Sequence, residues 1–361
     1  MRQVALALTP ALAALLAALP VGARADKPPA GESRPLFNGK DLTGWVNVNC
    51  APGTFVVKGN EIVTTGTPTG FLRTDRQYEN FELDFEWMHV EKTKMANSGL
   101  FVWGDPLPAV GTPYTRGIEV QVLLNYKPAD GWATSHGDVF SIHGAKCVPD
   151  RPHPKGFERC LPSEDRVKGG GEWNHYKVVA DDGTIKLHVN GKEVSGVGKC
   201  DPRKGYLALE SEGAECHFRN LTIKELPSTN PKPAETAKVW QGHTSLFTGV
   251  DLSGWATDEG AWTAKDGKLV AAGTAALTTG KAFGPAELIF DWKMPAKADG
   301  KCELEVGGKA ATVALPPTAK TGSWNRAVVT VENVGTPAPV TFKPAAGLEI
   351  MNVFIRELKG K

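Results

Sequence analysis

The chain carries the same series of short segments twice, in the same order. The paired segments are residues 36–45 (LFNGKDLTGW) and 246–255 (LFTGVDLSGW), 55–66 and 262–273, 81–87 (FELDFEW) and 286–292 (AELIFDW), 171–178 (GEWNHYKV) and 322–329 (GSWNRAVV), and, more loosely, 217–226 and 351–360. Five ordered matches are improbable by chance, so the sequence predicts two homologous domains. We place the first at 34–227 and the second at 242–361, joined by a Pro-rich linker at 228–241.

Both copies consist of short segments divided by turn-forming pairs such as Gly-Asn, Asp-Gly and Asn-Gly. These pairs favour tight hairpins because their residues tolerate positive φ angles. Ile185, Leu187 and Val189 alternate with polar residues, as in a half-buried strand. Few long segments repeat at helical spacing. The sequence therefore predicts an all-β protein made of two tandem jelly-roll-like β-sandwiches.

The two copies differ in length at one place. From Trp87 to Trp173 the first copy has 86 positions, whereas from Trp292 to Trp324 the second has 32. About 54 positions of the first copy are therefore missing from the second. Because the fold tolerates their absence, we expect any chemistry to lie in this private part of the first domain.

Charge and the N-terminus indicate where the protein works. The net charge is +1, so nothing indicates a nucleic-acid partner. Arg2 precedes an apolar run from Val4 to Leu19, and Ala23-Arg24-Ala25 resembles a cleavage site. We interpret residues 1–25 as a signal peptide rather than a membrane anchor, because the apolar run is short and contains Pro10. The mature protein is then expected in the periplasm or outside the cell, without stable membrane insertion.

Six cysteines occur in the chain. Export permits disulfides, and Cys147 and Cys160 bracket a Pro-rich loop that lacks any periodic pattern. We therefore predict a disulfide between these two residues. No CxxC spacing is present, which argues against a structural zinc site.

The segment FELDFEW places three acids, Glu82, Asp84 and Glu86, at every second position. This pattern is typical of a strand with one buried face, and it also fits the paired carboxylates of a retaining β-glucanase. The second copy keeps acids at the outer positions, Glu287 and Asp291, although it lacks most of the private segment. We therefore favour a framework strand with a solvated acidic face and keep the glucanase as an alternative.

The private segment contains the strongest candidates for chemistry. In RGIEVQVLLNY, residues 116–126, Glu119 and Gln121 share the polar face of an alternating strand, which suits sugar hydroxyls. The segment SHGDVFSIHGA, residues 135–145, adds His136, Asp138 and His143, the densest set of proton-transfer groups in the chain.

In these segments the chain resembles the 3-keto-disaccharide hydrolase domain family. The first copy contains LFNGKDLTGW, FLRTDRQYENFEL, NSGLF, GIEVQV, GEWN and FRNLTIKEL in the order of the family. The second copy carries only part of this set and is similar to a degenerate copy. The resemblance implies a concanavalin-like lectin or glucanase fold and cleavage of glycosides oxidised at C3. It best supports Glu119, Gln121 and Asn97 as site residues.

The chain departs from the pattern of the family at three places. Many members have Arg after the NSG motif, where this chain has Trp103. The EVQ strand often continues to Asp-Asn, which is Leu124-Asn125 here. The common Gln-x-His near the last strand is replaced by Glu210-Ser211-Glu212.

Cleavage beside a C3 ketone needs a base, an electrophile for the developing enolate oxygen and an acid for the leaving oxygen. We assign Glu119 or His136 as the base and His143 as the acid. Arg73, Arg116 or a bound divalent metal would stabilise the oxyanion.

Asn97, Gln121, Asp138 and the two arginines are expected to bind substrate. Trp103 and Trp132 are candidate platforms on which sugar rings stack. These platforms are also central to the second alternative, a non-catalytic, lectin-like carbohydrate-binding protein. The second domain is expected to bind, dock or stabilise and to be inactive alone. The sequence predicts neither the oligomeric state nor the aglycone.

Overall fold

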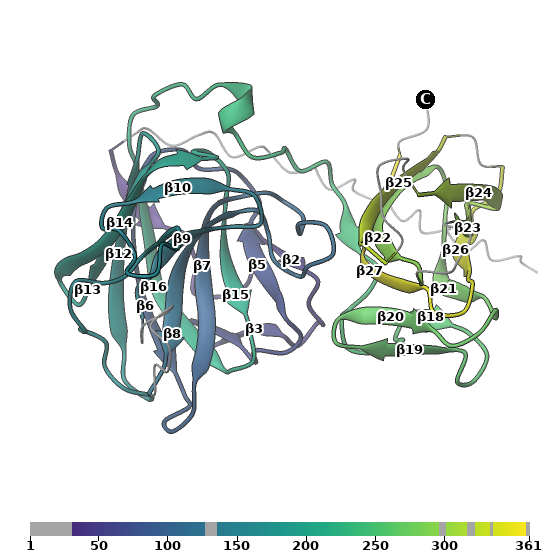
Figure 1. Ribbon diagram of the computed structural model, residues 1–361, viewed down its shortest axis with the longest axis horizontal. Helices are drawn as coiled ribbons and strands as arrows, with labels where there is room; N and C mark the ends of the chain where they lie inside the picture. The colour runs from purple at the N-terminus through teal and green to yellow at the C-terminus, as the bar shows by residue number, and fades with distance from the viewer. Residues whose placement is uncertain (1–30, 127–135, 296–300, 316–321, 333–334, 359–361) are drawn as a thin grey trace, which may run out of the picture.

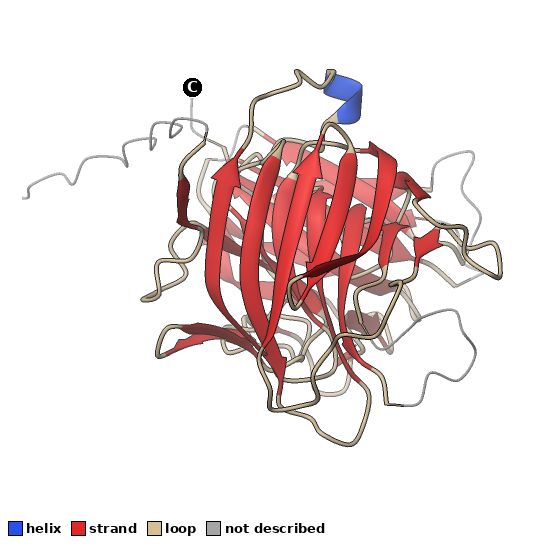
Figure 2. Ribbon diagram, turned by 90° about the vertical axis from the view of Figure 1, so that its left-hand side faces the viewer, coloured by secondary structure: helices blue, strands red, loops and turns tan. Residues whose placement is uncertain are grey.

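The computed structural model describes residues 31–126, 136–295, 301–315, 322–332 and 335–358. Within these ranges the chain forms β-strands and one short 3₁₀ turn, η1 (Pro233–Glu235). Two sheet-on-sheet bodies lie side by side in Figure 1, and Figure 2 shows the strands of one sheet in front of a second layer. The predicted all-β class with tandem sandwiches is confirmed. The predicted signal peptide and Trp132 lie outside the described residues.

The first sandwich has a nine-stranded and a seven-stranded antiparallel sheet. The nine-stranded sheet runs in the order β10 (Lys146–Pro149), β14 (Lys192–Asp201), β13 (Thr184–Val189), β12 (Asn174–Asp181), β6 (Phe81–His89), β16 (Cys216–Glu225), β4 (Glu61–Thr64), β3 (Phe55–Lys58), with β1 (Ser33–Pro35) paired to β16. The seven-stranded sheet runs β11 (Arg159–Cys160), β9 (Val139–Ile142), β8 (Gly117–Leu124), β7 (Ala96–Gly104), β15 (Tyr206–Ser211), β5 (Gly70–Thr74), β2 (Trp45–Val48).

The second sandwich repeats this plan with fewer strands in each sheet. One sheet runs β19 (Trp262–Lys265), β20 (Lys268–Ala271), β27 (Glu349–Glu357), β22 (Ala286–Lys293), β25 (Asn325–Val331), with β17 (Thr244–Ser245) paired to β27. The other runs β18 (Trp255–Ala256), β21 (Leu277–Phe283), β26 (Ala338–Lys343), β23 (Lys301–Val306), β24 (Lys309–Ala314). The predicted domain limits at 34–227 and 242–361 stay predictions.

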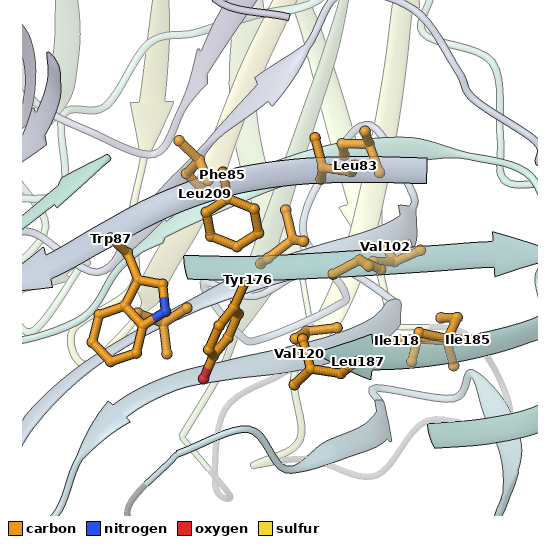
Figure 3. Close-up of a cluster of buried hydrophobic side chains, with 14 of the residues drawn as sticks. Leu83, Phe85, Trp87, Val102, Ile118, Val120, Tyr176, Ile185, Leu187 and Leu209 are labelled. Atoms are coloured by element: carbon orange, nitrogen blue, oxygen red, sulfur yellow. The ribbon is translucent and has the colours of Figure 1, made fainter. Parts of the chain in front are cut away.

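The core of the first sandwich follows from alternation along its strands. Phe81, Leu83, Phe85 and Trp87 of β6 are buried, whereas the residues between them are partly exposed. Their side chains meet those of the opposite sheet, among them Val102, Ile118, Val120 and Leu209, in the cluster of Figure 3. Full burial of a side chain of this size contributes about 1.5–3 kcal/mol, so these strands are fixed in register by their apolar faces.

The three acids of β6 lie on the opposite, outer face of the nine-stranded sheet. Each has a partner on a neighbouring strand: Glu82 with Lys177 (2.7 Å) and Lys224 (3.4 Å), Asp84 with His175 (3.1 Å), Glu86 with Arg219 (2.7 Å). A hydrogen bond from Lys177 is the largest influence that lowers the pKa of Glu82. The arrangement is that of a framework strand whose acids are paired with Lys, His and Arg side chains, and this does not favour the glucanase alternative.

The predicted disulfide between Cys147 and Cys160 is not formed. All six cysteines are buried free thiols, and these two lie on β10 and β11 within the apolar cluster. Hydrogen bonds hold the Pro-rich loop instead. Arg151 donates to the carbonyl of Leu161 over 2.6 Å, and the backbone amide of Ser163 donates to Val194 over 2.8 Å.

The two sandwiches meet through an apolar contact. Val48, Phe71, Phe101 and Ala208 of the seven-stranded sheet pack against Ile289 of β22 and Phe354 of β27. Figure 1 shows β22 and β27 on the side of the second body that faces β2 and β5. The second domain therefore covers part of the outer face of the seven-stranded sheet. Among the described residues, no helix has the length and apolarity needed to cross a membrane.

We expect reductant to leave the stability of the protein unchanged, because no bridge joins the cysteines. Thiol titration after denaturation without reductant should detect six thiols, and the melting temperature should be the same with and without dithiothreitol. Burial raises the pKa of the Cys147 thiol, which slows its oxidation in the folded state. Detection of only four thiols, with a melting temperature that falls on reduction, would contradict the structure.

Candidate acid site on the seven-stranded sheet

Strand β8 divides its side chains between the core and the outer face of its sheet. Ile118, Val120 and Val122 point into the core, so Glu119 and Gln121 lie on the outer face. Glu119 is paired in register with Phe101 on β7, and Phe101 belongs to the apolar contact between the domains. The candidate site therefore adjoins the interface with the second domain.

Glu210 on β15 approaches Glu119 across the backbone of β7. A Cβ atom at Gly99 of β7 would lie 3.0 Å from Oε1 of Glu119 and 3.0 Å from Oε2 of Glu210. Only glycine leaves space for both carboxyl groups above this strand. Glu212 follows at the end of β15 and contributes a third carboxyl group.

Two of these carboxyl groups, those of Glu119 and Glu210, are removed from water, and this changes their acidity. Glu119 is 7% exposed and Glu210 is 1% exposed. Burial, and then the charge of Glu212, raise the pKa of Glu119 to about 8, although Arg159 acts in the opposite direction. Burial and the neighbouring carboxyls also raise the pKa of Glu210 well above its usual range. Its Oε2 atom has no hydrogen-bond partner among the described residues. Such shifts are typical of functional carboxyl groups.

A chain of hydrogen bonds surrounds the carboxyl groups. Arg159 Nη1 donates to Asp138 over 2.6 Å and to Oε1 of Gln121 over 3.4 Å. Gln121 Nε2 donates to Oδ1 of Asn97 over 2.7 Å, and Asn97 in turn donates to Glu212. The acid network is our name for seven residues: Arg159, Asp138, Gln121, Asn97, Glu119, Glu210 and Glu212.

Tyr114 covers one side of the acid network. Its hydroxyl group donates to Oε1 of Glu212 over 2.7 Å, and its ring stacks on the ring of His143 with centroids 5.5 Å apart. Burial and the Glu212 carboxylate raise the pKa of Tyr114, so the phenol stays protonated at neutral pH. Burial lowers the pKa of His143.

The structure brings five predicted site residues together: Glu119, Gln121, Asn97, Asp138 and His143. The first four belong to the acid network, and His143 reaches it through Tyr114. The grouping agrees with the sequence analysis, but the roles of these residues stay predictions.

Two predicted site residues lie at the margin of the acid network. His136 is buried beside Asp165, with Nδ1 3.3 Å from Oδ1, and its Nε2 faces the amide of Arg166 at 3.4 Å. Burial lowers the pKa of His136, against the charges of Asp165 and Asp138, and its role as a base stays a prediction. Arg116 pairs with Asp105 over 3.2 Å at the edge of the site.

Arg73 and Trp103 serve the framework. Arg73 is 1% exposed and donates to the carbonyls of Pro106 (2.9 Å) and Thr74 (2.8 Å), so it cannot stabilise an oxyanion at Glu119. Trp103 is fully buried in the core, where its indole donates to the carbonyl of Glu79 over 2.7 Å. The predicted stacking role of Trp103 is therefore wrong: the strand turns the ring inward.

The sequence analysis missed four residues of the site: Glu210, Glu212, Tyr114 and Arg159. The two glutamates were visible only as a departure from the pattern of the family. Their position on a strand beside β7 was the signal that could have identified them. Tyr114 lies in a loop and Arg159 on a two-residue strand, and neither place has a periodic pattern.

A cavity of about 780 Å³ lies between the domains and reaches His143, whose ring stacks on Tyr114. Its wall includes His143 and Arg116, residues 105–110 and part of the linker. Val110, Val239 and Val328, three exposed apolar residues, also line it. Apolar walls with a few polar groups at a domain interface are typical of ligand sites.

The acid network does not have the geometry of a metal site. In the described part of the chain, no three His, Cys, Asp or Glu side chains converge as ligands would. We therefore derive no step of the chemistry through a metal.

We expect Glu119→Gln to stabilise the fold increasingly as the pH rises. The folded protein retains the Glu119 proton up to about pH 8, whereas the unfolded chain releases it near its ordinary pKa of 4.5. The wild type therefore loses stability across this window, and the variant does not. The difference in unfolding free energy should grow by on the order of 1–3 kcal/mol between pH 5 and pH 8.5. Chemical denaturation at both pH values measures it, with Glu82→Gln as the flat control; a pH-independent difference for Glu119→Gln would contradict the burial argument.

Comparison with known proteins gives a family match. The chain matches the family described as the 3-keto-alpha-glucoside-1,2-lyase-like domain over residues 32–224 and 242–314. A Parabacteroides distasonis crystal structure provisionally assigned as a glycosyl hydrolase is similar at 24% identity over 55% of this chain and 94% of that chain, with a TM-score of 0.41.

Two further structures are similar at lower identity. The carbohydrate-binding module CBM66 from Bacillus subtilis is 15% identical over 52% of this chain and 99% of its own, with a TM-score of 0.36. The VIP36 exoplasmic/lumenal domain is 9% identical over 56% and 93%, with a TM-score of 0.39. Scores at this level decide neither fold nor function, and no curated protein matches the chain. With both copies matched, this chain belongs to the 3-keto-alpha-glucoside-1,2-lyase-like domain family.

Proposed function

We propose that this chain is an exported enzyme that cleaves glycosides whose sugar carries a ketone at C3. The observation that carries the proposal is the buried carboxyl group of Glu119, with a pKa raised to about 8, between Glu210, Glu212 and Arg159. Membership of a family described by a 3-keto-alpha-glucoside 1,2-lyase supports the substrate class.

The chemistry follows from the ketone. A carbonyl at C3 acidifies the proton on C2, and a base that removes this proton leaves an enolate. The electron pair then forms the C1–C2 double bond while the bond from C1 to the aglycone oxygen breaks. The leaving oxygen takes a proton, and water adds to the unsaturated sugar in a second step. Direct hydrolysis would give the same products.

Glu119 fits the role of the base. Its raised pKa makes its carboxylate a stronger base than an ordinary glutamate, and it titrates near working pH. Burial and the neighbouring carboxyls also raise the pKa of Glu210, and its protonated form can donate a hydrogen bond to the developing enolate oxygen or a proton to the leaving oxygen.

Tyr114 and the cavity supply the remaining functions. The Tyr114 hydroxyl is a second protonated donor next to Glu212. Burial lowers the pKa of His143, so a smaller fraction of its rings carries the proton that an acid would give to the leaving oxygen. The cavity beside His143, with its exposed valines, suits an apolar aglycone.

A non-catalytic, sugar-binding function is the second candidate. It is favoured by the low exposure of Glu119 and by the hydrogen bonds that Asn97 and Gln121 already make to each other. In that case oligosaccharides would bind without turnover.

Export remains part of the proposal on the strength of the N-terminal pattern. Arg2, the apolar run from Val4 to Leu19 and the small residues before Asp26 are typical of a cleaved signal. A periplasmic or extracellular enzyme would meet glycosides oxidised outside the cytoplasm.

We expect Glu119→Gln to lower kcat/KM on a 3-keto-glucoside by about 10²-fold or more, because a general base contributes on that scale. Glu82→Gln is the matched control: it alters a paired acid on the outer face of β6 and should stay close to wild type. Product analysis would use the 3-keto-glucoside, its unoxidised parent and a β-glucan. Full turnover by Glu119→Gln would remove Glu119 from the mechanism, and binding without product from any substrate would favour the sugar-binding function.

A further inference from the structure

The loop of residues 105–116 connects β7 to β8 and carries Tyr114 over the acid network. We call it the cover loop. Its base is fixed by Arg73, which donates to the carbonyl of Pro106 over 2.9 Å. Its tip is a tight turn, in which the amide of Ala109 donates to the carbonyl of Tyr114 over 2.8 Å. Tyr114 can therefore keep its contact with Glu212 only if the tip is held in place.

Three side chains of the second domain hold the tip. Asp291 on β22 accepts a hydrogen bond from the amide of Gly111 over 2.9 Å. Asn352 on β27 donates to the carbonyl of Thr112 over 2.9 Å, and Arg326 on β25 donates to the carbonyl of Pro108 over 2.8 Å. We call Asp291, Asn352 and Arg326 the clamp.

The three side chains of the clamp are also hydrogen-bonded to one another. Asp291 is completely buried, and Arg326 binds both of its oxygens, over 2.7 and 2.9 Å. Asn352 donates to the same carboxylate over 2.6 Å. A two-point guanidinium–carboxylate pair fixes geometry as well as charge, so the acceptor and donors face the loop in one arrangement.

The tip of the loop is shaped to fit the clamp. Gly111 has a φ of +72°, and a Cβ atom there would lie 2.4 Å from Cγ of Trp324 in the second domain. The position therefore excludes a side chain for two reasons, the backbone conformation and the contact with Trp324.

The first domain contains the same pair of an acid and an asparagine on neighbouring strands, but there the pair faces solvent. In the repeat, Glu86 corresponds to Asp291, and each lies beside an asparagine with positive φ, Asn220 (+54°) and Asn352 (+51°). Asn220 donates to Glu86 over 2.7 Å, as Asn352 does to Asp291. In the described part of the chain, Glu86 accepts its hydrogen bonds from Arg219 and Asn220, both in the first domain. The second copy thus uses a shared motif for a contact that the first copy lacks.

We propose that the second domain positions Tyr114: the clamp holds the cover loop closed over the acid network, and Asp291, Arg326 and Asn352 are positioning residues for that site. The contact itself is independent of the reaction, but its effect on turnover rests on the proposed function. The expected partner of the clamp is the backbone of the cover loop, not a substrate.

Hydrogen exchange measured by mass spectrometry tests the clamp on the full chain without any substrate. In Asn352→Ala, amides of the cover loop, Gly111 included, should exchange about tenfold faster than in wild type, while β8 and β22 stay protected. Asn220→Ala is the matched control and should leave the loop unchanged. Gly111→Ala disturbs the same contact from the side of the first domain. It replaces Asn352→Ala as the test variant if Asn352→Ala unfolds the second domain. Wild-type protection of the cover loop in both variants would overturn the proposal.

A double-mutant cycle separates positioning from general stability. Tyr114→Phe and Asn352→Ala should each lower kcat on a 3-keto-glucoside, and the double variant should lose little more than Tyr114→Phe alone, because both act through one hydroxyl group. Fully additive losses would overturn the positioning role. If the wild type turns over no 3-keto-glucoside, the proposed function fails, whereas the exchange measurement still decides the clamp.

Discussion

The burial of two neighbouring carboxyl groups, those of Glu119 and Glu210, is the constraint on which the candidate site depends. Glu119 and Glu210 face each other above Gly99, and a buried pair of this kind cannot carry two charges at modest energetic cost. Protonation relieves the repulsion, and the charge of Arg159 opposes the rise in the pKa of Glu119. The pKa values of these carboxyl groups stay raised only while solvent is excluded. Other parts of the protein must therefore cover the cluster.

Each layer of the cover depends on the next. Tyr114 closes the acid network, the cover loop carries Tyr114, and the second domain holds the loop through the clamp. The apolar contact of Phe71 and Phe101 with Phe354 brings the two sheets close enough for these hydrogen bonds to form. The reactivity of a residue on β8 is thereby linked to side chains on β22 and β27, far along the chain.

Sequence reasoning succeeded where a property follows from strand periodicity. The alternation around Glu119 placed it on the outer face with Gln121, and comparison of FELDFEW with AELIFDW identified a framework strand. It failed where a property depends on which way a loop or strand end turns. Trp103, expected to be a stacking platform, has a φ of +57° and turns into the core. The cysteine pairing failed for the same reason, since hydrogen bonds from Arg151 fix the loop without a bridge.

The repeat explains how one fold supplies both a site and its support. The private segment of the first copy contains β7, β8 and β9, which provide Asn97, Glu119 and the strand that packs beside them. The second copy lacks that segment. Its counterpart of Glu86, Asp291, is fully buried and accepts a hydrogen bond from the amide of Gly111 in the first domain. The same outer strand face therefore meets solvent in the first copy and a loop of the other domain in the second.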